Sequence, residues 1–426
     1  MHHDILEELQ WRGLIHQHTD RDQLAKQLAE PTSVYAGFDP TAPSLHCGSL
    51  LPLMALRRFQ KAGHKPIALV GGATGMIGDP SGKSEERVLL SPDVLAENVD
   101  GIKQQMSRVL DFDGPAAATL VNNFDWMEKW SYIDFLRDVG KNFPVNVMLS
   151  KDSVKSRLSN SDSGLSYTEF SYMLLQAYDF AHLSEHHDCM LQIGGSDQWG
   201  NITAGIDLAR RMHGRHLHAL TCPLLLTSDG KKMGKTESGA VWLDAERTSP
   251  YAFYQYWVNV LDSDVLMCLR FLTEIDQEEY KHLESRVAEE PHKREAQKRL
   301  AGWLTEFLHG AEGLQTAQRA TEVFFGAEIS DLSDKQLGEI FADVPSATTP
   351  AQSLADGLPL TDAFALVGLA KSKSEARRTI KQGGAYVNNR RIEDENYQLT
   401  TADLASESVI VLRSGKRKFA LLRVES

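Results

Sequence analysis

A strand, a helix and a second strand follow one another closely near the start of this chain, and this pattern constrains the fold most. Residues 33–38 are typical of a short strand ending in a turn, and a helix is predicted from about 48 to 62. The continuous apolar run 66–70, which glycines follow, is typical of a buried parallel strand. Such a βαβ unit predicts an α/β first domain with a parallel sheet.

The rest of the chain divides by its local patterns. Two more strands are predicted at 118–121 and 189–193, and residues 251–325 are helical and rich in charge. A polar stretch with two prolines is the predicted linker. The predicted parts are a Rossmann-like α/β domain at 1–245 with a helical insert around 125–165, an α-helical domain at 246–342, the linker at 343–357 and a small α+β domain at 358–426.

Charge is distributed unevenly along the chain. The formal net charge is −13, which by itself does not indicate a nucleic-acid binder. The segment from Lys371 to the end has 12 Lys and Arg against 7 Asp and Glu, so it carries +5 and the remainder carries −18. This asymmetry fits a nucleic-acid-facing tail on an acidic body, and equally well a solvated basic face.

The cysteines and the first residues indicate the compartment. Four cysteines stand singly without a CxxC pair, which favours reduced thiols over a zinc site or a disulfide framework. The first residues lack the basic run and apolar stretch of a signal peptide, and no run of about 18 apolar residues occurs. We therefore expect a cytoplasmic protein without a membrane span or a metal site.

Two motifs have the residue types that bind phosphate. The first is His46-Cys-Gly-Ser49 at a strand-to-helix junction, where free N–H groups attract anions and Gly48 allows close approach. The second is Lys232-Met-Gly-Lys235, in a polar loop whose two ammonium groups could close over a triphosphate. Each motif alone has an ordinary explanation, a helix cap for His46 and a solvated basic turn for the lysines.

Three further segments carry polar groups that suit a ligand. A glycine-rich loop at 71–80 follows a predicted strand but does not match the GxGxxG fingerprint. Asp197 and Gln198 follow another strand, at the edge where open α/β folds bind ligands. On a helix, Tyr172, Gln176 and Asp179 would share one face, and their burial would need a polar ligand.

Taken together, the motifs resemble those of the class I aminoacyl-tRNA synthetases. His46-Cys-Gly-Ser49 is similar to the HIGH motif of that class, and the lysine loop, ending in Thr236, is similar to KMSKS. Ser49 departs from the family, because histidine is typical there. Segments 35–41, 71–80 and 194–200, with the helix that carries Asp179, resemble the bacterial tyrosyl branch. The basic tail resembles a small RNA-binding domain named after a ribosomal protein.

The resemblance implies a role for each motif residue. Tyrosine would bind at Tyr35, Asp79, Tyr172, Gln176, Asp179 and Gln198. ATP would bind at Gly37, Asp39, His46, Gly48, Ser49, Gly195, Asp197 and Lys235. The residues expected to stabilise the transition state are Thr41, His46, Lys83, Arg87, Lys232, Lys235 and Thr236. RNA would bind at Lys371, Lys373, Arg377, Arg378 and Lys381.

The reaction implied is activation of L-tyrosine by ATP, followed by transfer to tRNA(Tyr). ATP would enter as a substrate with Mg²⁺, without a tightly bound cofactor, and the helical domain would contact the anticodon. The family forms homodimers, which would place the interface in the insert near 131–161. Two alternatives stay open: a tryptophanyl synthetase, which shares the fold, and a non-catalytic RNA-binding protein on a synthetase scaffold.

Overall fold

The computed structural model describes residues 4–81, 90–151, 154–155, 158, 164–236, 239–324, 326–329, 332–342, 344–415 and 418–425. The chain forms two units, Met1–Thr248 with Trp257–Leu308, and Ser249–Tyr256 with His309–Ser426. These units do not follow the expected domain boundaries. Residues 257–308, which were expected in a separate helical domain, group with the first unit because their helix α13 (Asp262–Leu272) packs on α3 (Cys47–Lys61).

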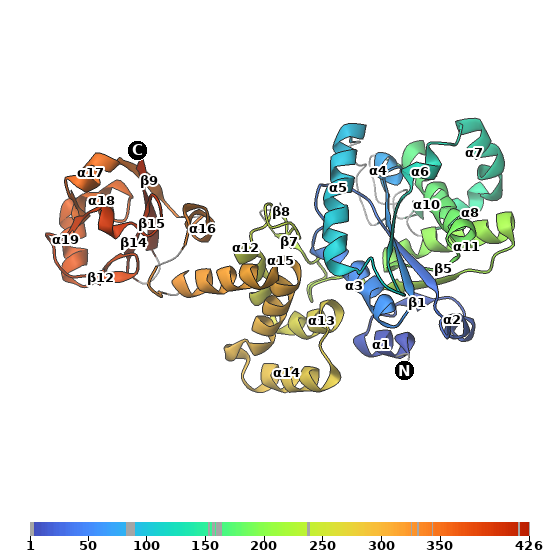
Figure 1. Ribbon diagram of the computed structural model, residues 1–426, viewed down its shortest axis with the longest axis horizontal. Coiled ribbons are helices and arrows are strands. Elements are labelled where there is room, and N and C mark those ends of the chain that lie inside the picture. The colour runs from blue at the N-terminus through green and yellow to red at the C-terminus, as the bar shows by residue number, and fades with distance from the viewer. Residues whose placement is uncertain are drawn as a thin grey trace. The chain divides into compact units, whose positions relative to one another are not determined.

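A six-stranded sheet forms the centre of the first unit (Figure 1). In spatial order its strands are β1 (Gln17–His18), β6 (His218–Cys222), β5 (Cys189–Gly195), β2 (Ser33–Phe38), β3 (Lys65–Val70) and β4 (Thr119–Asn122). All neighbours are parallel except β1 and β6. The expected Rossmann-like parallel sheet is therefore confirmed, and β6, at one side of it, was missed by the sequence analysis.

The strand order reverses between β2 and β5. From β2 the chain proceeds through β3 to β4, whereas from β5 it proceeds in the opposite direction to β6. Helices α3 and α5 (Pro92–Val109) lie on one side of the sheet, and α10 (Tyr167–His186) and α11 (Trp199–His213) lie on the other (Figure 1). Ligands of open α/β sheets bind where the order reverses, at the carboxyl ends of the strands.

Helices α10 and α11 pack unusually closely, and a glycine makes this possible. Ser166 caps α10 by accepting a hydrogen bond from the backbone N–H of Glu169, and apolar side chains bury most of the helix. A Cβ added at Gly205 of α11 would lie 3.0 Å from the Cβ of Phe180 and 3.5 Å from the Cα of Ala177. Gly205 therefore sets the separation of the two helices.

Short helices surround this framework. In the first unit they are α1 (Ile5–Arg12), α2 (Arg21–Gln27), α4 (Thr74–Ile77), α6 (Phe124–Met127), α7 (Tyr132–Asp138), η1 (Gly140–Asn142), α8 (Val145–Ser150), η2 (Ser196–Gln198), α14 (Gln277–Glu289) and η3 (Pro291–Lys293). The short strands β7 (Lys235–Thr236) and β8 (Gly239–Ala240) form a separate antiparallel pair. The helices α12 (Pro250–Val258) and α15 (Glu295–Phe324) contribute to both units, and Gly310 interrupts the long α15 with φ 77° and ψ 174°.

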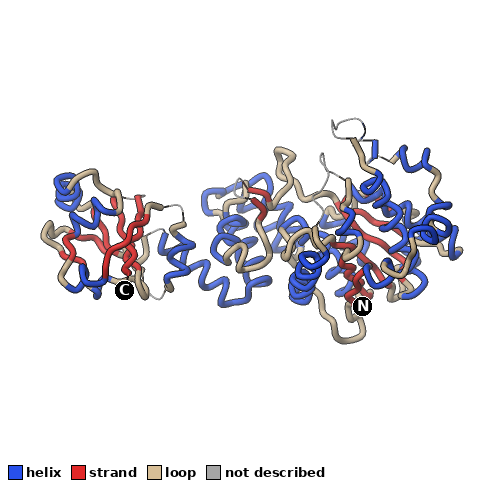
Figure 2. Tube along the Cα trace, turned by 90° about the horizontal axis from the view of Figure 1, so that it is seen from above, coloured by secondary structure: helices blue, strands red, loops and turns tan. Residues whose placement is uncertain are grey.

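The second unit contains a five-stranded sheet with helices beside it (Figure 2). In spatial order the strands are β12 (Arg390–Ile392), β11 (Ala385–Val387), β14 (Val409–Ser414), β15 (Lys418–Glu425) and β9 (Ser346–Pro350). A second pair joins β10 (Leu358–Pro359) to β13 (Gln398–Leu399). The helices are α16 (Asp334–Ile340), α17 (Ala351–Ala355), α18 (Leu360–Leu366), α19 (Lys373–Lys381) and η4 (Thr401–Asp403). Their buried apolar side chains form the core of the expected α+β domain.

Within the predicted linker at 343–357, the described residues 344–357 are ordered structure instead. Its residues form β9, which pairs in parallel with β15, and the helix α17. Prolines suggested a linker, but Pro345 precedes the strand and Pro350 ends it, and β9 is an edge strand. Proline is compatible with the ends of an edge strand, because its missing N–H is not needed by the sheet there.

Candidate active site

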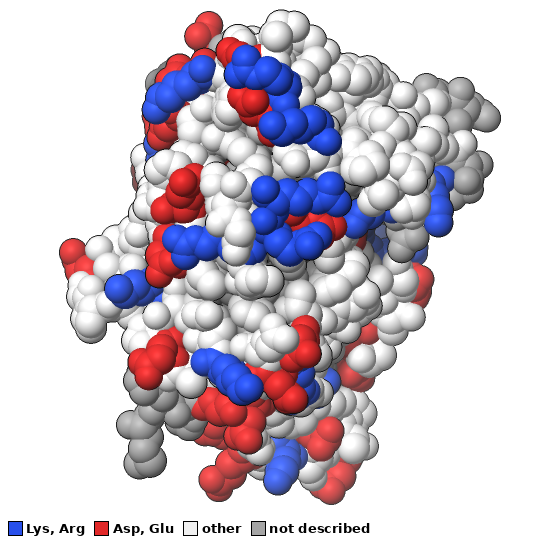
Figure 3. Space-filling view, turned by 90° about the vertical axis from the view of Figure 1, so that its right-hand side faces the viewer, with Lys and Arg blue, Asp and Glu red and all other residues white. Residues whose placement is uncertain are grey.

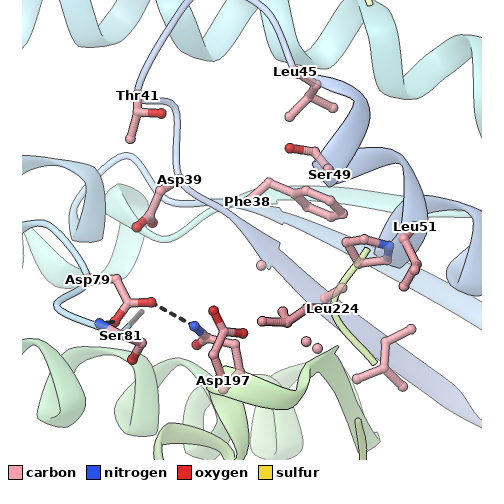
Figure 4. Close-up of a pocket in the computed structure, with 18 of the residues that line it drawn as sticks. Phe38, Asp39, Thr41, Leu45, Ser49, Leu51, Asp79, Ser81, Asp197 and Leu224 are labelled. Atoms are coloured by element: carbon pink, nitrogen blue, oxygen red, sulfur yellow. Dashed lines mark hydrogen bonds between the residues drawn. The ribbon is translucent and has the colours of Figure 1, made fainter. Parts of the chain in front are cut away.

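A cavity of about 340 Å³ opens at the point where the strand order reverses. Asp39, Asp79 and Asp197 lie on one side of it, and Ser49 lies on the other, at the start of α3 (Figure 4). The predicted site residues that line it are Tyr35, Gly37, Asp39, Thr41, His46, Gly48, Ser49, Asp79, Tyr172, Gln176, Asp179, Gly195, Asp197, Gln198, Lys232 and Lys235. Lys83 and Arg87 lie outside the described residues, as does the side chain of Thr236.

Tyr35 and Asp179 form the closed end of the cavity. Tyr35 is 1% exposed and Asp179 is 2% exposed. The Nε1–H of Trp126 donates to Oδ1 of Asp179 at 2.9 Å, and Nδ2 of Asn123 donates to Oδ2 at 3.0 Å. Among the described residues, the hydroxyl of Tyr35 has no hydrogen-bond partner. This end therefore presents one buried hydroxyl that can still donate and a carboxylate that can still accept.

Burial changes the ionisation of both side chains. Burial raises the pKa of Asp179 to about 7, against the opposing effect of the hydrogen bonds from Asn123 and Trp126, and the charge of Asp39 raises it further. Burial also raises the pKa of Tyr35, and the neighbouring Asp179 contributes in the same direction. Tyr35 therefore stays a neutral hydroxyl, and Asp179 changes its charge near neutral pH.

Asn123 and Trp126 were missed by the sequence analysis. Asn123 directly follows β4, at the same carboxyl edge of the sheet as the other site residues, and Trp126 lies in α6. A polar residue after a strand of a parallel sheet is the signal that would have found Asn123. A single tryptophan in a short helix carries no comparable signal.

A network of amides and carboxylates forms the middle of the cavity. Nε2 of Gln198 donates to Oδ2 of Asp79 at 2.7 Å, and the backbone N–H of Ser81 donates to Oδ1 at 2.9 Å. Nδ2 of Asn201 donates to Oε1 of Gln176 at 3.0 Å and to Oε1 of Gln198 at 3.2 Å. The amides are thus oriented in fixed directions, and the carboxylate of Asp79 suits a ligand ammonium group.

The hydroxyl of Tyr172 lines the cavity and contacts Asp39. It was expected at a substrate amino group, and in this structure it donates to Oδ2 of Asp39 at 3.0 Å. The hydroxyl of Thr74 donates to the other oxygen of Asp39 at 2.8 Å. Both carboxylate oxygens are therefore held in place, and a Cβ at Gly71 would lie 2.3 Å from one of them. Position 71 of the glycine-rich loop therefore requires glycine, because Asp39 fills the space that a Cβ would need.

His46 caps the helix whose N-terminus faces the cavity. Its Nδ1 accepts a hydrogen bond from the backbone N–H of Gly48 at 3.0 Å. Nδ1 must then lack a proton, so the neutral ring carries its proton on Nε2 and can donate from there. A Cβ at Gly48 would lie 2.8 Å from Cε1 of His46, so only glycine fits this cap.

The loop with the two lysines packs against the same helix start. Its arms are joined by a bridge between Leu226 and Lys232. The backbone N–H of Val241 donates to the carbonyl of Gly234 at 2.8 Å, and the N–H of Cys47 donates to the carbonyl of Val241 at 3.0 Å. Lys232 and Lys235 therefore line the cavity together with His46. Cationic and hydrogen-bond-donating groups at this end suit the phosphates of a nucleotide.

The five basic residues predicted to bind RNA are exposed on or next to α19 of the second unit. Lys373 pairs with Asp362 at 2.8 Å, and Lys381 pairs with Glu395 at 3.2 Å. The first unit differs, since acidic and basic side chains are interspersed there between broad uncharged areas on the face that Figure 3 shows.

Sequence and structure comparisons agree with this geometry. The family described as tRNA synthetases class I (W and Y) matches residues 26–326, and the Tyrosine--tRNA ligase SYY-like C-terminal domain matches residues 336–422. The chain belongs to this family and is a class I tRNA synthetase. The same closed end that presents Tyr35 and Asp179 suits a hydroxylated side chain.

The particular activity follows from full-length relatives. The chain is 62% identical over 423 residues to a tyrosine--tRNA ligase of Rhodopirellula baltica, covering 99% of this chain and 96% of that one. It is 52% identical to one of Roseiflexus castenholzii, covering 99% of both chains. Its function is that of a tyrosine--tRNA ligase, an ATP-dependent enzyme of protein biosynthesis. Neither the tryptophanyl nor the non-catalytic alternative fits these relatives.

Solved structures show the same fold. A C-terminally truncated mitochondrial tyrosyl-tRNA synthetase of Aspergillus nidulans superposes with a TM-score of 0.68 and 30% identity, covering 76% of this chain and 94% of that one. Its counterpart from Coccidioides posadasii gives 0.65 and 33% identity, covering 74% and 91%. A tryptophanyl-tRNA synthetase of Encephalitozoon cuniculi, at 15% identity, shares the fold alone.

Proposed function

We propose that Tyr35 and Asp179 recognise the phenolic hydroxyl of tyrosine. The observation that carries this is the partnerless buried hydroxyl of Tyr35 next to a carboxylate with remaining acceptor capacity. The substrate phenol would accept from Tyr35 and donate to Asp179, which satisfies both groups. With phenylalanine bound, both stay unpaired inside a buried site, and that is unfavourable.

The amino group of tyrosine would bind next to Asp79, Gln176 and Gln198. Asp79 supplies the negative charge, and the two amides are oriented by Asn201. Tyr172 contributes through Asp39, whose carboxylate it holds, and Asp39 and Asp197 would accept from the ribose hydroxyls of ATP. Gly37, Gly48 and Gly195 line the cavity and would let the nucleotide approach the backbone.

The chemistry needs no nucleophilic side chain. The carboxylate of tyrosine is already ionised and attacks the α-phosphorus of ATP, the bond to the β-phosphate oxygen breaks, and pyrophosphate leaves with Mg²⁺. His46 would donate from Nε2 to a phosphate oxygen, with Thr41 and Ser49 as further donors. Lys232 and Lys235 would neutralise the leaving pyrophosphate, together with Lys83, Arg87 and Thr236. A ribose hydroxyl of the terminal tRNA adenosine then takes the tyrosyl group.

Single-turnover formation of tyrosyl-adenylate tests the phenol site. Asp179→Ala removes the acceptor, and we expect it to abolish activation of tyrosine while ATP binding persists. Asp113, which is exposed and lies outside both the cavity and the insert, gives the control Asp113→Ala, which should activate tyrosine normally. A site built around a hydroxyl rejects the analogue without it by roughly 10⁴-fold or more, a rule for which tyrosyl-tRNA synthetase is itself the reference case. Near-normal activation of tyrosine by Asp179→Ala contradicts the proposed role.

The insert is proposed as the homodimer interface. Its helices α7 and α8 expose large apolar side chains, among them Tyr132 at 63%, Ile133 at 68% and Val145 at 58%. A second copy of the chain would cover this apolar surface. Ile133→Glu should produce monomers in sedimentation velocity, and Leu261→Glu, at an equally exposed site outside the insert, should not. A dimeric Ile133→Glu protein contradicts this interface.

The basic helix α19 is proposed to bind tRNA(Tyr) phosphates. The double variant Arg377→Glu, Arg378→Glu should weaken tRNA binding. It should also lower the slope of log affinity against log salt concentration by an amount equal to roughly two phosphate contacts, because each phosphate contact releases counterions when it forms. Pyrophosphate exchange, which needs no tRNA, should stay unchanged. Unaltered salt dependence contradicts the proposal.

We further propose a cytoplasmic location, which the four buried free cysteines support. None of the described helices has the length and apolarity to cross a membrane.

A further inference from the structure

One face of helix α13 contacts the lysine loop, residues 225–235. Asp264 and Cys268 lie four residues apart on this face, and both are buried. The backbone N–H of Ser228 donates to Oδ1 of Asp264 at 3.0 Å. The thiol of Cys268 contacts Sδ of Met233 at 3.5 Å. One helix face therefore contacts the loop at two points.

The two contacts are on opposite arms of the loop. The backbone N–H of Met233 donates to the carbonyl of Leu225 at 2.9 Å, and Leu226 pairs with Lys232. Ser228 belongs to the first arm and Met233 to the second. Lys232 lies immediately before Met233, and Lys235 lies two residues after it. The position of both ammonium groups therefore depends on where α13 holds the arms.

The other end of α13 is fixed to the helix that begins at His46. The guanidinium of Arg58, from α3, donates to the carbonyls of Arg270 and Thr273, at 3.3 Å and 2.9 Å. Arg12 donates to the same two carbonyls. Carbonyls at a helix C-terminus lack partners within the helix, so cations bind there favourably. Through α13, the lysine loop and His46 share one rigid support.

Asp264 lies in the first turn of α13, and its carboxylate also accepts from outside the helix. Asp264 is 3% exposed, and its carboxylate also accepts from the hydroxyl of Ser263 at 3.1 Å. No cation among the described residues forms an ion pair with it. The positive end of the helix dipole favours a carboxylate in this turn, whereas burial without a cation opposes it. The carboxylate contributes something that an apolar residue would not, namely a strong acceptor for the loop backbone.

We propose that Asp264 is a positioning residue for tyrosine activation, which holds the loop so that Lys232 and Lys235 reach the pyrophosphate. Cys268 supports the second arm through Met233. The inference rests on the proposed roles of the two lysines, and it adds a residue that touches neither substrate. Loss of Asp264 should slow the chemical step and leave tyrosine binding unchanged, because Tyr35 and Asp179 lie at the other end of the cavity.

Single-turnover adenylate formation gives the first test. Asp264→Ala should lower the rate of the step roughly 10- to 100-fold, the range for a lost hydrogen bond to a charged group, with the tyrosine dissociation constant unchanged. Asp264→Asn retains an acceptor oxygen, and a neutral bond is about half as strong, so it should lose only about 3- to 10-fold. Glu278→Ala, an exposed carboxylate in the first turn of the neighbouring helix α14, is the control and should be normal.

A double-mutant cycle separates positioning from general destabilisation. In a background of Lys232→Ala and Lys235→Ala, Asp264→Ala should lower the rate no further, because its effect acts through the lysines. An additive loss, or a normal rate in the single variant, overturns the inference while the lysine roles stand. If the lysine variants activate tyrosine at the normal rate, the proposed function of the loop fails as well. Should Asp264→Ala not fold, Asp264→Asn and Cys268→Ala are used in the same cycle.

Discussion

Replacing Tyr35 by phenylalanine should make the unliganded protein more stable and a poorer enzyme. The change deletes one oxygen atom that is buried and has no hydrogen-bond partner. The ring, which packs on Phe180 with centroids 5.2 Å apart, is retained. The substitution therefore isolates the hydroxyl, and its effects on stability and activity have opposite signs.

The magnitudes follow from the state of the hydroxyl. A buried unsatisfied polar group destabilises a fold by about 1–3 kcal/mol, so the free energy of unfolding should rise by that amount. The hydroxyl would donate to the substrate phenol, and a neutral hydrogen bond contributes about 0.5–1.5 kcal/mol, so kcat/KM for tyrosine should fall roughly 2- to 12-fold. Phenylalanine has no phenol oxygen, so its activation should not fall.

Urea unfolding of the unliganded protein and pyrophosphate exchange with each amino acid measure the two effects. Tyr280→Phe is the matched control, because the hydroxyl of Tyr280 is exposed and its hydrogen bond to Glu284 is long, at 3.4 Å. It should change neither quantity by more than a few tenths of a kcal/mol. The reasoning is refuted if Tyr35→Phe leaves stability unchanged, or if it lowers activation of tyrosine and phenylalanine equally.

Three further outcomes follow from the site. Because the ionised form of Asp179 accepts the phenol proton, kcat/KM for tyrosine should rise with pH through an apparent pKa of about 7. The raised pKa of Asp179 also means that its contribution to the free energy of unfolding falls as pH rises from about 4 to 7. Trp126→Phe removes a donor that favours the charged carboxylate, so that midpoint should move upward, and a downward shift contradicts the assignment. Gly234→Ala, at φ 82° and with its Cβ 2.8 Å from the Cβ of Cys47, should strain the loop by about 1–2 kcal/mol and slow adenylate formation; unchanged single-turnover rates would exclude this.

The strands and helices that line the cavity were predictable because their signals are local. The apolar run of β3 and the cap at His46 are visible within a few residues, and the order of the motifs placed them at one sheet edge. The strand β12 was not predicted, because its hairpin turns through Asn388 and Asn389 at positive φ, without the Asn-Gly pair that usually marks such a turn. The paired β9 was read as a linker for its prolines.

Hydrogen-bond partners were less predictable than site membership. The residue types of Asp39 and Tyr172 suggested contact with substrate, but not the hydrogen bond that joins the two side chains in the folded chain. The support of Asp179 by Trp126 depends on the packing of α6 against α10, which no periodicity encodes. The contact between Ser228 and Asp264 joins residues 36 positions apart through a backbone N–H, a group that every residue except proline has.

Gly205 touches no predicted ligand, yet it determines how far apart the two walls of the amino-acid pocket stand. The helix on one side of it carries Asp179, and the helix that contains it carries Asn201, which orients the amides. A Cβ here would lie 3.0 Å from the Cβ of Phe180, so a larger residue would force the two helices to shift. The selectivity of the enzyme for its amino acid therefore depends partly on how α10 packs against α11, and not only on the residues that contact the substrate.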